Sequence, residues 1–436
     1  ISSETALSSS GRGREPGFEM ILRAQILEKG RYSYDKAVFR SYRDMVPNQY
    51  ELGYFLVAQA RKEYGPEIWR SALNTVARKP FMITPFSRGI RKVSGLKKIP
   101  FYKQILDSLE AGWEKQLGQT HVEPVEKISQ DQRYFTEFTH PQVDSQGNIY
   151  ALKTGIDDIP RIIRIDPSGK EEVVFTPGRI YQETLAYGNG KLCWSEKETH
   201  PRWDNVEYAV IKVFDVETGK IRKFTSKTRY FAPAISPDGS RIAAVEVKAN
   251  NNYSITILDI QTGKPLNNIV FQDDVFPMTP AWAEDNKTLA AIILGDKGKS
   301  LVVVDAENGE TKTIIPFTYK EISHPVFSGD DILFTGSFSG INNIYKVVMG
   351  SGNISRITSV PFGCDFVCYD ESTDRIIFSN YDSKGYHLTG MPVKEGTPFN
   401  KVQDHSIKLY ESIVQQNNFN LDRSEERRVG KECATG

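Results

Sequence analysis

The sequence is poor in the features that define several classes of protein. Of four cysteines in 436 residues, Cys433 lies in a tail that we set aside below, and the odd number of scattered cysteines that remains argues against a disulfide framework. Basic and acidic residues are equal at 55 each, so no net charge draws the whole chain toward nucleic acid or anionic lipid, and such binding would need a local patch. The apolar runs, such as residues 289–294, are far shorter than the roughly 20 residues of a membrane-spanning helix. We predict a chain without a transmembrane helix and without a nucleic acid partner.

The composition is that of a folded protein, and both ends of the sequence indicate a piece of a longer chain. Hydrophobic residues make up 39% and aromatic residues 11%, and the length suggests two or three domains or a repeat array. The sequence opens at Ile1 without an initiator methionine or leader features, which favours a fragment. Residues 423–436 depart from the preceding composition and resemble a vector-derived tail, so we predict that they are not native.

The first part of the chain has the apolar period of helices. Over residues 17–118, apolar side chains recur every three or four positions, as at Tyr50 and Tyr54, and Gly65 follows that stretch as a helix stop. Such stripes bury one face of each helix against its neighbours. We predict a helical bundle over residues 1–120.

A loop rich in glycine and serine, residues 4–16, precedes these helices and carries Arg12 and Arg14. One interpretation is a flexible connector. The other is a binding loop, because a guanidinium group presents forked donors that suit a carboxylate or a phosphate. Both arginines are therefore binding candidates.

From about residue 134 the sequence repeats. Short apolar strands end in turns of the form Asp-x-x-x-Gly or near variants, separated by 43 to 50 residues. The turns end at Gly169, Gly219, Gly263, Gly309, Gly352 and Gly396. This spacing matches the four-stranded blade of a β-propeller. The repeat predicts a six-bladed propeller over residues 134–403.

A second marker runs in phase with the first. A proline stands at the head of an apolar strand, six residues before the end of a tight turn rich in Asp, Asn and Gly, which is the chemistry of a hairpin. These prolines are Pro141, Pro233, Pro280 and Pro325. We place the turn between the first two strands of a blade. Residues 121–133 are interpreted as a linker or as a strand that closes the ring, and residues 404–422 as a C-terminal extension.

Two parts of the sequence resemble known families. Residues 234–243, AISPDGSRIA, are similar to the WD40-like repeat of TolB and of the N-terminal propellers of prolyl oligopeptidases. Residues 4–16, 50–54 and 64–69 look like the downstream half of a gluzincin-type zinc peptidase domain. Together they resemble envelope proteins of Bacteroidetes in which such a domain precedes a propeller. The resemblance implies a location in the periplasm, at the cell surface or at the outer membrane.

The sequence lacks the motifs of the enzymes that it resembles. Gluzincins bind zinc through an HExxH helix and a later glutamate, but the six histidines of this chain are never four positions apart. Prolyl oligopeptidases need a serine at the centre of G-x-S-x-G, whereas residues 336–340 carry Phe338 there. We predict no catalytic residue, no metal ligand and no cofactor in this chain, with zinc expected only in an intact parent peptidase domain.

Four further residues are binding candidates. His140 and His324 each precede a proline at the same position of a blade, near the entrance of the central channel, where the alternative is a polar lining of the mouth. Arg202 and Trp203 lie in the long loop 196–207, and these residue types anchor interfaces. A packed tryptophan surrounded by solvated charge is an equally good interpretation of that loop.

Two functions remain open from the sequence. The first is a non-catalytic fragment of a bacterial cell-envelope protein whose propeller binds a protein, a peptide or a glycan on one rim. The second is a zinc metallopeptidase gated by the propeller, whose HExxH motif and third ligand lie upstream of Ile1. Both share one predicted fold, a multidomain chain with a partial gluzincin-like helical bundle followed by an all-β, six-bladed propeller.

Overall fold

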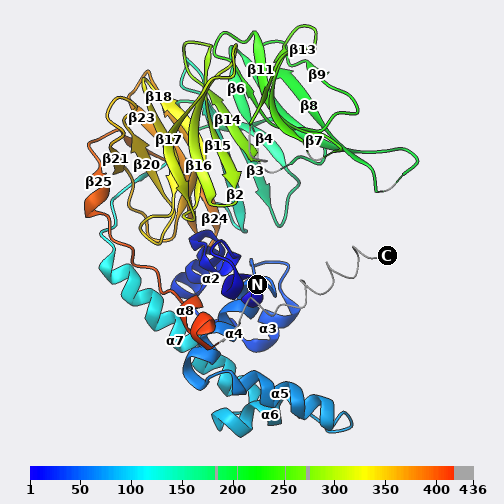
Figure 1. The fold of residues 1–436 in the computed structure, drawn as a ribbon, viewed down its shortest axis with the longest axis vertical. Coiled ribbons are helices and arrows are strands. Elements are labelled where there is room, and N and C mark those ends of the chain that lie inside the picture. The colour runs from blue at the N-terminus through cyan, green and yellow to red at the C-terminus, as the bar shows by residue number, and fades with distance from the viewer. Residues whose placement is uncertain (182–184, 204, 251, 272–274, 417–436) are drawn as a thin grey trace, which may run out of the picture. The chain divides into compact units, whose positions relative to one another are not determined.

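A computed structural model describes residues 1–181, 185–203, 205–250, 252–271 and 275–416 (Figure 1). The predicted non-native tail, residues 423–436, lies outside the described residues. The helices are α1 Ser2–Leu7, α2 Pro16–Lys29, α3 Tyr34–Phe39, α4 Glu51–Tyr64, α5 Glu67–Arg78, α6 Pro85–Ser94, α7 Lys98–Gln119 and α8 Tyr410–Gln416, with 3-10 turns η1 Arg12–Arg14 and η2 Phe399–Lys401. In the part of the chain that is described, none of these helices combines the length and apolar character needed to span a bilayer.

The helices begin and end where local chemistry directs them. Gly30, Gly65 and Gly95 follow α2, α4 and α6 with φ angles of 71°, 74° and 75°, a region that glycine enters without strain. Ser33 caps α3 by accepting a hydrogen bond from the backbone N–H of Lys36. These signals are local, so the sequence predicts this part of the fold well.

The strands form six antiparallel sheets, each one blade of a propeller (Figure 1). The first three blades are β2 Thr136–Val143, β3 Ile149–Gly155, β4 Arg161–Ile165 and β5 Glu171–Phe175; β6 Ala186–Gly188, β7 Lys191–Thr199, β8 Glu207–Asp215 and β9 Ile221–Lys223; and β10 Tyr230–Ile235, β11 Arg241–Val247, β12 Tyr253–Asp259 and β13 Pro265–Val270. The last three are β14 Phe276–Trp282, β15 Thr288–Gly295, β16 Gly298–Asp305 and β17 Thr311–Thr318; β18 Ile322–Ser328, β19 Asp331–Gly336, β20 Asn343–Val347 and β21 Ile354–Arg356; and β22 Cys364–Asp370, β23 Arg375–Asp382 and β24 Gly385–Pro392 with β1 Glu126–Lys127. The predicted helical region followed by a six-bladed propeller is confirmed.

The ring closes through a strand from the beginning of the propeller sequence. β1 pairs with β24, with Glu126 opposite Gly390, and so supplies the outer strand of the sixth blade. The repeat that ends at Gly396 is therefore not a turn inside that blade, which corrects the sequence interpretation of a sixth equivalent copy. The chain instead continues into β25, Thr397–Pro398, which pairs with β21 of the fifth blade. The outer edge of the sixth blade is already occupied by β1.

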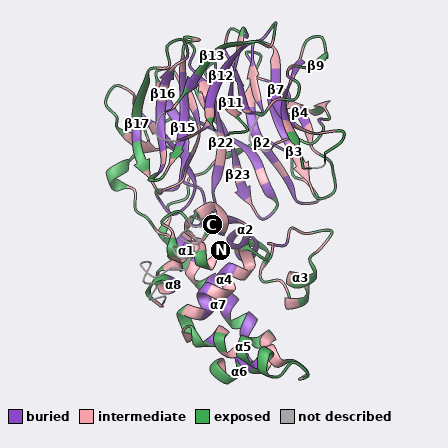
Figure 2. Cartoon of the chain, turned by 45° about the vertical axis from the view of Figure 1, so that its right-hand side comes forward, coloured by how far each residue is buried: buried purple, intermediate pink, exposed green. Residues whose placement is uncertain are grey.

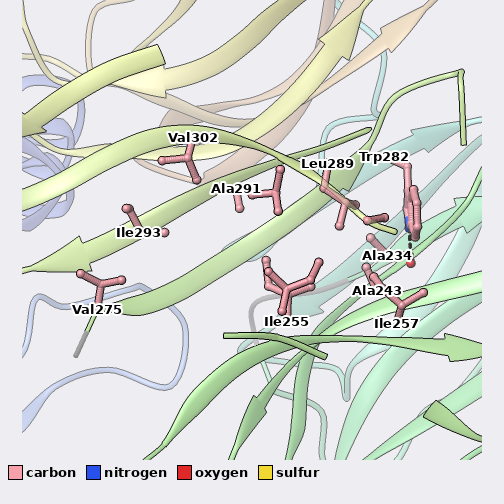
Figure 3. Packing of buried hydrophobic residues seen from close by; sticks show 13 residues of the cluster. Ala234, Ala243, Ile255, Ile257, Val275, Trp282, Leu289, Ala291, Ile293 and Val302 are labelled. Atoms are coloured by element: carbon pink, nitrogen blue, oxygen red, sulfur yellow. Dashed lines mark hydrogen bonds between the residues drawn. The ribbon is translucent and has the colours of Figure 1, made fainter. Parts of the chain in front are cut away.

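Neighbouring blades pack face to face through apolar side chains. Figure 2 shows the strands of the propeller largely buried. Between the third and fourth blades, small residues such as Ala243 and Ala291 alternate with Ile255 and Leu289, and all four are buried (Figure 3). The indole N–H of Trp282 donates to a backbone carbonyl of the third blade at 3.1 Å. Burying such residues stabilises each blade contact by about 1.5–3 kcal/mol per large side chain.

The chain divides into two compact units. The helical unit comprises residues 1–14, 48–112 and the described residues from 407 onward. The propeller unit comprises residues 15–47 and 113–406. This division differs from the boundary at residue 120 expected from the sequence, because α2, α3 and the last turns of α7 belong with the propeller.

Helix α2 joins the propeller through a buried hydrogen-bond network around its own Arg23–Glu19 ion pair. The guanidinium Nη1 of Arg23 donates to Glu19 Oε1 at 3.0 Å and to Gln116 Oε1 at 3.1 Å, and its Nη2 donates to the carbonyl of Phe362. The indole Nε1 of Trp113 donates to Glu19 Oε1 at 2.6 Å. The Arg23 side chain is only 1% exposed. The network connects α2, the end of α7 and the loop before β22.

Candidate binding site in the propeller channel

The innermost strand is interrupted at an equivalent place in five of the six blades. The ladder register shifts there, and one residue at each shift has a positive φ. These residues, which we call the bulge ring, are His140 at 54°, Ala232 at 46°, Thr279 at 38°, His324 at 49° and Phe366 at 55°. A β-bulge redirects a side chain away from the regular ladder.

The bulge ring holds backbone strain. Residues other than glycine rarely adopt positive φ, and a β-branched residue such as Thr279 does so least readily. Four of the five positions precede a proline, which cannot donate to the ladder and so fits an interrupted strand. Each such residue costs about 1–3 kcal/mol, and strain of this kind clusters at functional sites. The strain therefore makes the bulge ring a candidate functional site.

All five residues of the bulge ring line one cavity of about 390 Å³, to which every blade contributes. Most of the residues in its wall are apolar, with several prolines and the rings of Tyr187, Trp282 and Phe366. Six polar side chains line it as well: His140, Gln142, Asn189, Thr279, Glu284 and His324. A cavity of this size has the dimensions of a small binding pocket, and although most of its residues are apolar types, its wall exposes more polar than apolar surface.

His324 is held by the partly buried carboxylate of Asp365. Its Nδ1 lies 2.7 Å from Asp365 Oδ1, which also accepts from the hydroxyl of Thr335 at 2.7 Å and from the backbone N–H of Phe366 at 2.8 Å. Burial disfavours the imidazolium, but the charge and hydrogen bond of Asp365 outweigh it, so the pKa of His324 is raised above its ordinary value. Burial likewise opposes ionisation of Asp365, yet the His324 pair keeps the pKa of this carboxyl below its usual range.

His140 lies beside this pair in a different state. Its ring centroid is 6.1 Å from that of His324 and 4.1 Å from that of Phe366. The side chain is buried, at 7% exposure, and neither ring nitrogen has a hydrogen-bond partner among the described residues. Burial, and secondly the charge of His324, lower the pKa of His140 to about 3. His140 is thus a neutral imidazole whose donor and acceptor nitrogens are both buried.

The Asp365→Asn variant is expected to lower the pKa of His324 below its ordinary value, because burial then acts without an opposing carboxylate. In the native chain the stability from this pair is fully present below the ordinary pKa of 6.5 and is lost as pH rises through the raised pKa. NMR titration of the imidazole Cε1 protons measures the change. Asp296→Asn, on an exposed hairpin, is the control and should leave the titration of His324 where it is. A His324 curve that does not move would contradict the pairing.

These side chains can bind and orient a polar group. The His–Asp pair fixes the tautomer and raises the basicity of the imidazole, as in many proton-transfer sites. No group of three or more His, Cys, Asp or Glu residues in the described ranges could hold a metal ion. The described residues therefore do not fit a zinc centre of the kind that the gluzincin resemblance implies.

The two arginines of the N-terminal segment are engaged within the helical unit. Arg12 Nε and Nη2 donate to the two carboxylate oxygens of Glu4 at 2.6 and 2.9 Å, and the Arg12 hydrogen bond lowers the pKa of Glu4 to about 2. Arg14 Nε donates to the carbonyl of Thr5 at 3.0 Å, and its guanidinium lies 4.2 Å from the ring centroid of Tyr410. The segment forms α1 and η1, so its interpretation as a flexible connector is wrong.

Arg202 and Trp203 lie in the turn between β7 and β8, away from the residues that line the channel cavity. His200 Nδ1 accepts from the backbone N–H groups of both residues, at 3.1 and 3.2 Å. The guanidinium of Arg202 lies 5.2 Å from the ring centroid of Trp203, which is 57% exposed. The alternative of a core-packed tryptophan is therefore wrong for Trp203.

The sequence predicted that His140 and His324 lie near the channel, but it did not predict that Asp365 and Phe366 contact them. Asp365 and Phe366 occupy in the sixth blade the position of Ser323 and His324 in the fifth, as the equivalent register shifts show. The sixth blade lacks the proline that marks this position elsewhere, having Val367 instead. Alignment of the repeats by their later Asp-rich turns would have found the two residues.

No family model matches the sequence, and no curated protein matches it either. Among solved structures, the chain is similar to TolB of Acinetobacter baumannii, with 14% identity over 67% of this chain and 92% of that one and a TM-score of 0.37. It is similar to the β-propeller domain of the trilobed protease of Pyrococcus furiosus, with 12% identity over 62% of this chain and 99% of that one and a TM-score of 0.41. A gluconolactonase of Xanthomonas campestris shares 12% identity over 62% of this chain and 89% of its own, with a TM-score of 0.44. Likeness at this level concerns the propeller fold alone.

Proposed function

We propose that the propeller is a binding module that takes a peptide segment of a protein partner into its central cavity. The observation that carries the proposal is the imidazole of His140, which is buried in the cavity wall without a partner for either nitrogen among the described residues. A buried polar atom without a partner costs about 1–3 kcal/mol, so a ligand that satisfies it gains that energy on binding.

Two features of this cavity favour a peptide over a glycan. A backbone amide offers one donor and one acceptor, which is what the neutral imidazole of His140 requires. The wall is rich in proline and aromatic side chains, which pack against extended peptide. Six polar side chains also line the wall, so a glycan is the alternative that the oligosaccharide array tests.

The proposal is tested with an array of random synthetic dodecapeptides and an array of oligosaccharides, both probed with the full chain. We expect peptides to be selected, and His140→Phe to weaken them at least tenfold, because a ring of similar size loses both nitrogens. His121→Phe, at an exposed position outside the cavity, is the matched control and should bind as the native chain does. Selection of oligosaccharides alone, or peptide binding that His140→Phe leaves intact, would refute the proposal.

The zinc peptidase interpretation stays a separate proposal. Its support is the resemblance of residues 4–16, 50–54 and 64–69 to gluzincin helices, and a location at the cell envelope rests on the resemblance of the repeat to TolB. Zinc-dependent peptide cleavage by a longer form of the chain that carries an HExxH motif would support it. Cleavage by the 436-residue chain alone, abolished by a chelator, would instead mean that the metal ligands lie within residues 1–436.

A further inference from the structure

Helices α5 and α6 form a tightly packed hairpin within the helical unit. A Cβ atom added at Gly89 of α6 would lie 2.5 Å from the Cα of Ala72 in α5, so the two backbones are in close contact. The hydroxyl of Ser71 donates to the carbonyl of Gly89 at 2.9 Å. The rings of Trp69 and Phe86 stack with centroids 6.3 Å apart. The loop between the helices is therefore presented on a well-packed support.

That loop exposes large apolar side chains. Residues 79–84, which we call the hairpin tip, include Phe81 at 99% exposure and Ile83 at 85%. An apolar side chain so fully in water forgoes the free energy of burial. Two such side chains at the end of a hairpin indicate a surface that another apolar phase covers.

The hairpin is also strongly basic. Residues 67–98 carry eight lysines and arginines and a single acidic residue, a net charge of +7 in a chain whose total is zero. The one glutamate, Glu67, pairs with Arg70 at 2.7 Å. Six exposed basic residues have no acidic partner within ion-pair distance among the described residues: Arg78, Lys79, Arg88, Arg91, Lys92 and Lys97. This is the local patch that the overall composition conceals.

We propose that the α5–α6 hairpin docks on an anionic lipid surface, with Phe81 and Ile83 entering the interface and the basic residues facing the headgroups. Apolar side chains beside a basic belt are the features of interfacial membrane binding. Basic residues near such a surface each add to the attraction. The phosphates of a nucleic acid would also attract the basic residues, but a nucleic acid offers no apolar phase in which Ile83 could be buried. The proposal is independent of the ligand in the propeller cavity.

The experiment is co-sedimentation of the full chain with vesicles. We expect binding to vesicles of about 30% phosphatidylglycerol in phosphatidylcholine, at least tenfold weaker binding to phosphatidylcholine alone, and loss of the difference at high salt. Phe81→Ser/Ile83→Ser should weaken binding at least tenfold on both vesicles. Arg78→Gln/Lys79→Gln/Arg88→Gln should weaken it at least tenfold on the anionic vesicles only.

Matched controls lie elsewhere on the same unit. Tyr50→Ser removes another exposed aromatic ring, and Lys62→Gln/Lys103→Gln removes two exposed charges outside the hairpin, so both should bind as the native chain does. Circular dichroism confirms that each variant is folded. If Phe81→Ser/Ile83→Ser does not fold, Arg78→Gln/Lys79→Gln/Arg88→Gln still tests the proposal. The proposal is overturned if the native chain binds neither vesicle, if hairpin and control variants behave alike, or if it binds a short DNA duplex but no vesicle.

Discussion

Replacing Arg23 with methionine is expected to lower the free energy of unfolding of the propeller unit by about 3–5 kcal/mol, the loss typical of a buried ion pair left with one partner. The change removes the donors to Glu19, Gln116 and the carbonyl of Phe362. Each acceptor then loses the donor that Arg23 supplied, which is costly because water cannot replace that donor at a buried site.

The unpaired charge of Glu19 lowers the free energy of unfolding further than the loss of the hydrogen bonds alone would. Burial raises the pKa of Glu19 and lowers that of Arg23, so each group depends on the other to stay ionised. Without Arg23, the Glu19 carboxylate keeps the hydrogen bond from the indole N–H of Trp113 but loses the positive charge beside it, so it takes up a proton on folding. The stability cost of the variant therefore grows as pH rises.

Urea unfolding followed by circular dichroism measures the effect. The double variant Glu19→Met/Arg23→Met removes both charges and should be more stable than the single variant, since no buried charge is left alone. Arg70→Met breaks an exposed ion pair with Glu67 and should cost less than about 1 kcal/mol. An Arg23→Met loss as small as that of Arg70→Met would show that α2 does not depend on this network.

Glu137→Gln is expected to flatten the pH dependence of stability between about pH 5 and 8. Burial raises the pKa of Glu137 in β2 to about 7 from an ordinary 4.5. The stability tied to the protonated group is fully present below pH 4.5 and is lost as pH rises through about 7. Since the side chain is partly solvated, we expect this loss to be about 2–3 kcal/mol in the native chain and absent in the variant.

The measurement is the unfolding free energy of the native chain and the variant at matched pH values. Only the difference between the two curves reports Glu137, because other buried groups titrate in both proteins. Glu310→Gln, at an exposed position, should run parallel to the native curve. Two parallel curves for native chain and Glu137→Gln would mean that this carboxyl is ionised across the range.

The sequence predicted the two histidines of the candidate site but not the carboxylate that pairs with one of them. His140 and His324 share a position in the repeat, so the sequence indicates that both face the channel. Asp365 was not foreseen, because its blade has Val367 where other blades have proline, and because it follows His324 by 41 residues. That His140 has no partner among the described residues whereas His324 has one depends on the three-dimensional arrangement of separate blades, which no local pattern encodes.

The helical region shows the same division. The ends of α2 and α4 follow from glycines next to them in the chain. The assignment of α2 to the propeller unit depends on Arg23 reaching Gln116, 93 positions away, and Phe362, 339 positions away. The charge of the α5–α6 hairpin is visible in the sequence, but the exposure of Phe81 and Ile83 is not.

The sequence by itself determined the repeating blades, because Asp, Asn, Gly and Pro direct turns through contacts within a few residues, and those turns recur at a regular interval; the turn expected at Gly396 was the exception. Tertiary structure alone decided how the ring closes, which side chains meet around its axis and which strained residues face the cavity. These features depend on contacts between distant segments, and their energies are set by burial and by neighbouring charges that exist only in the folded chain.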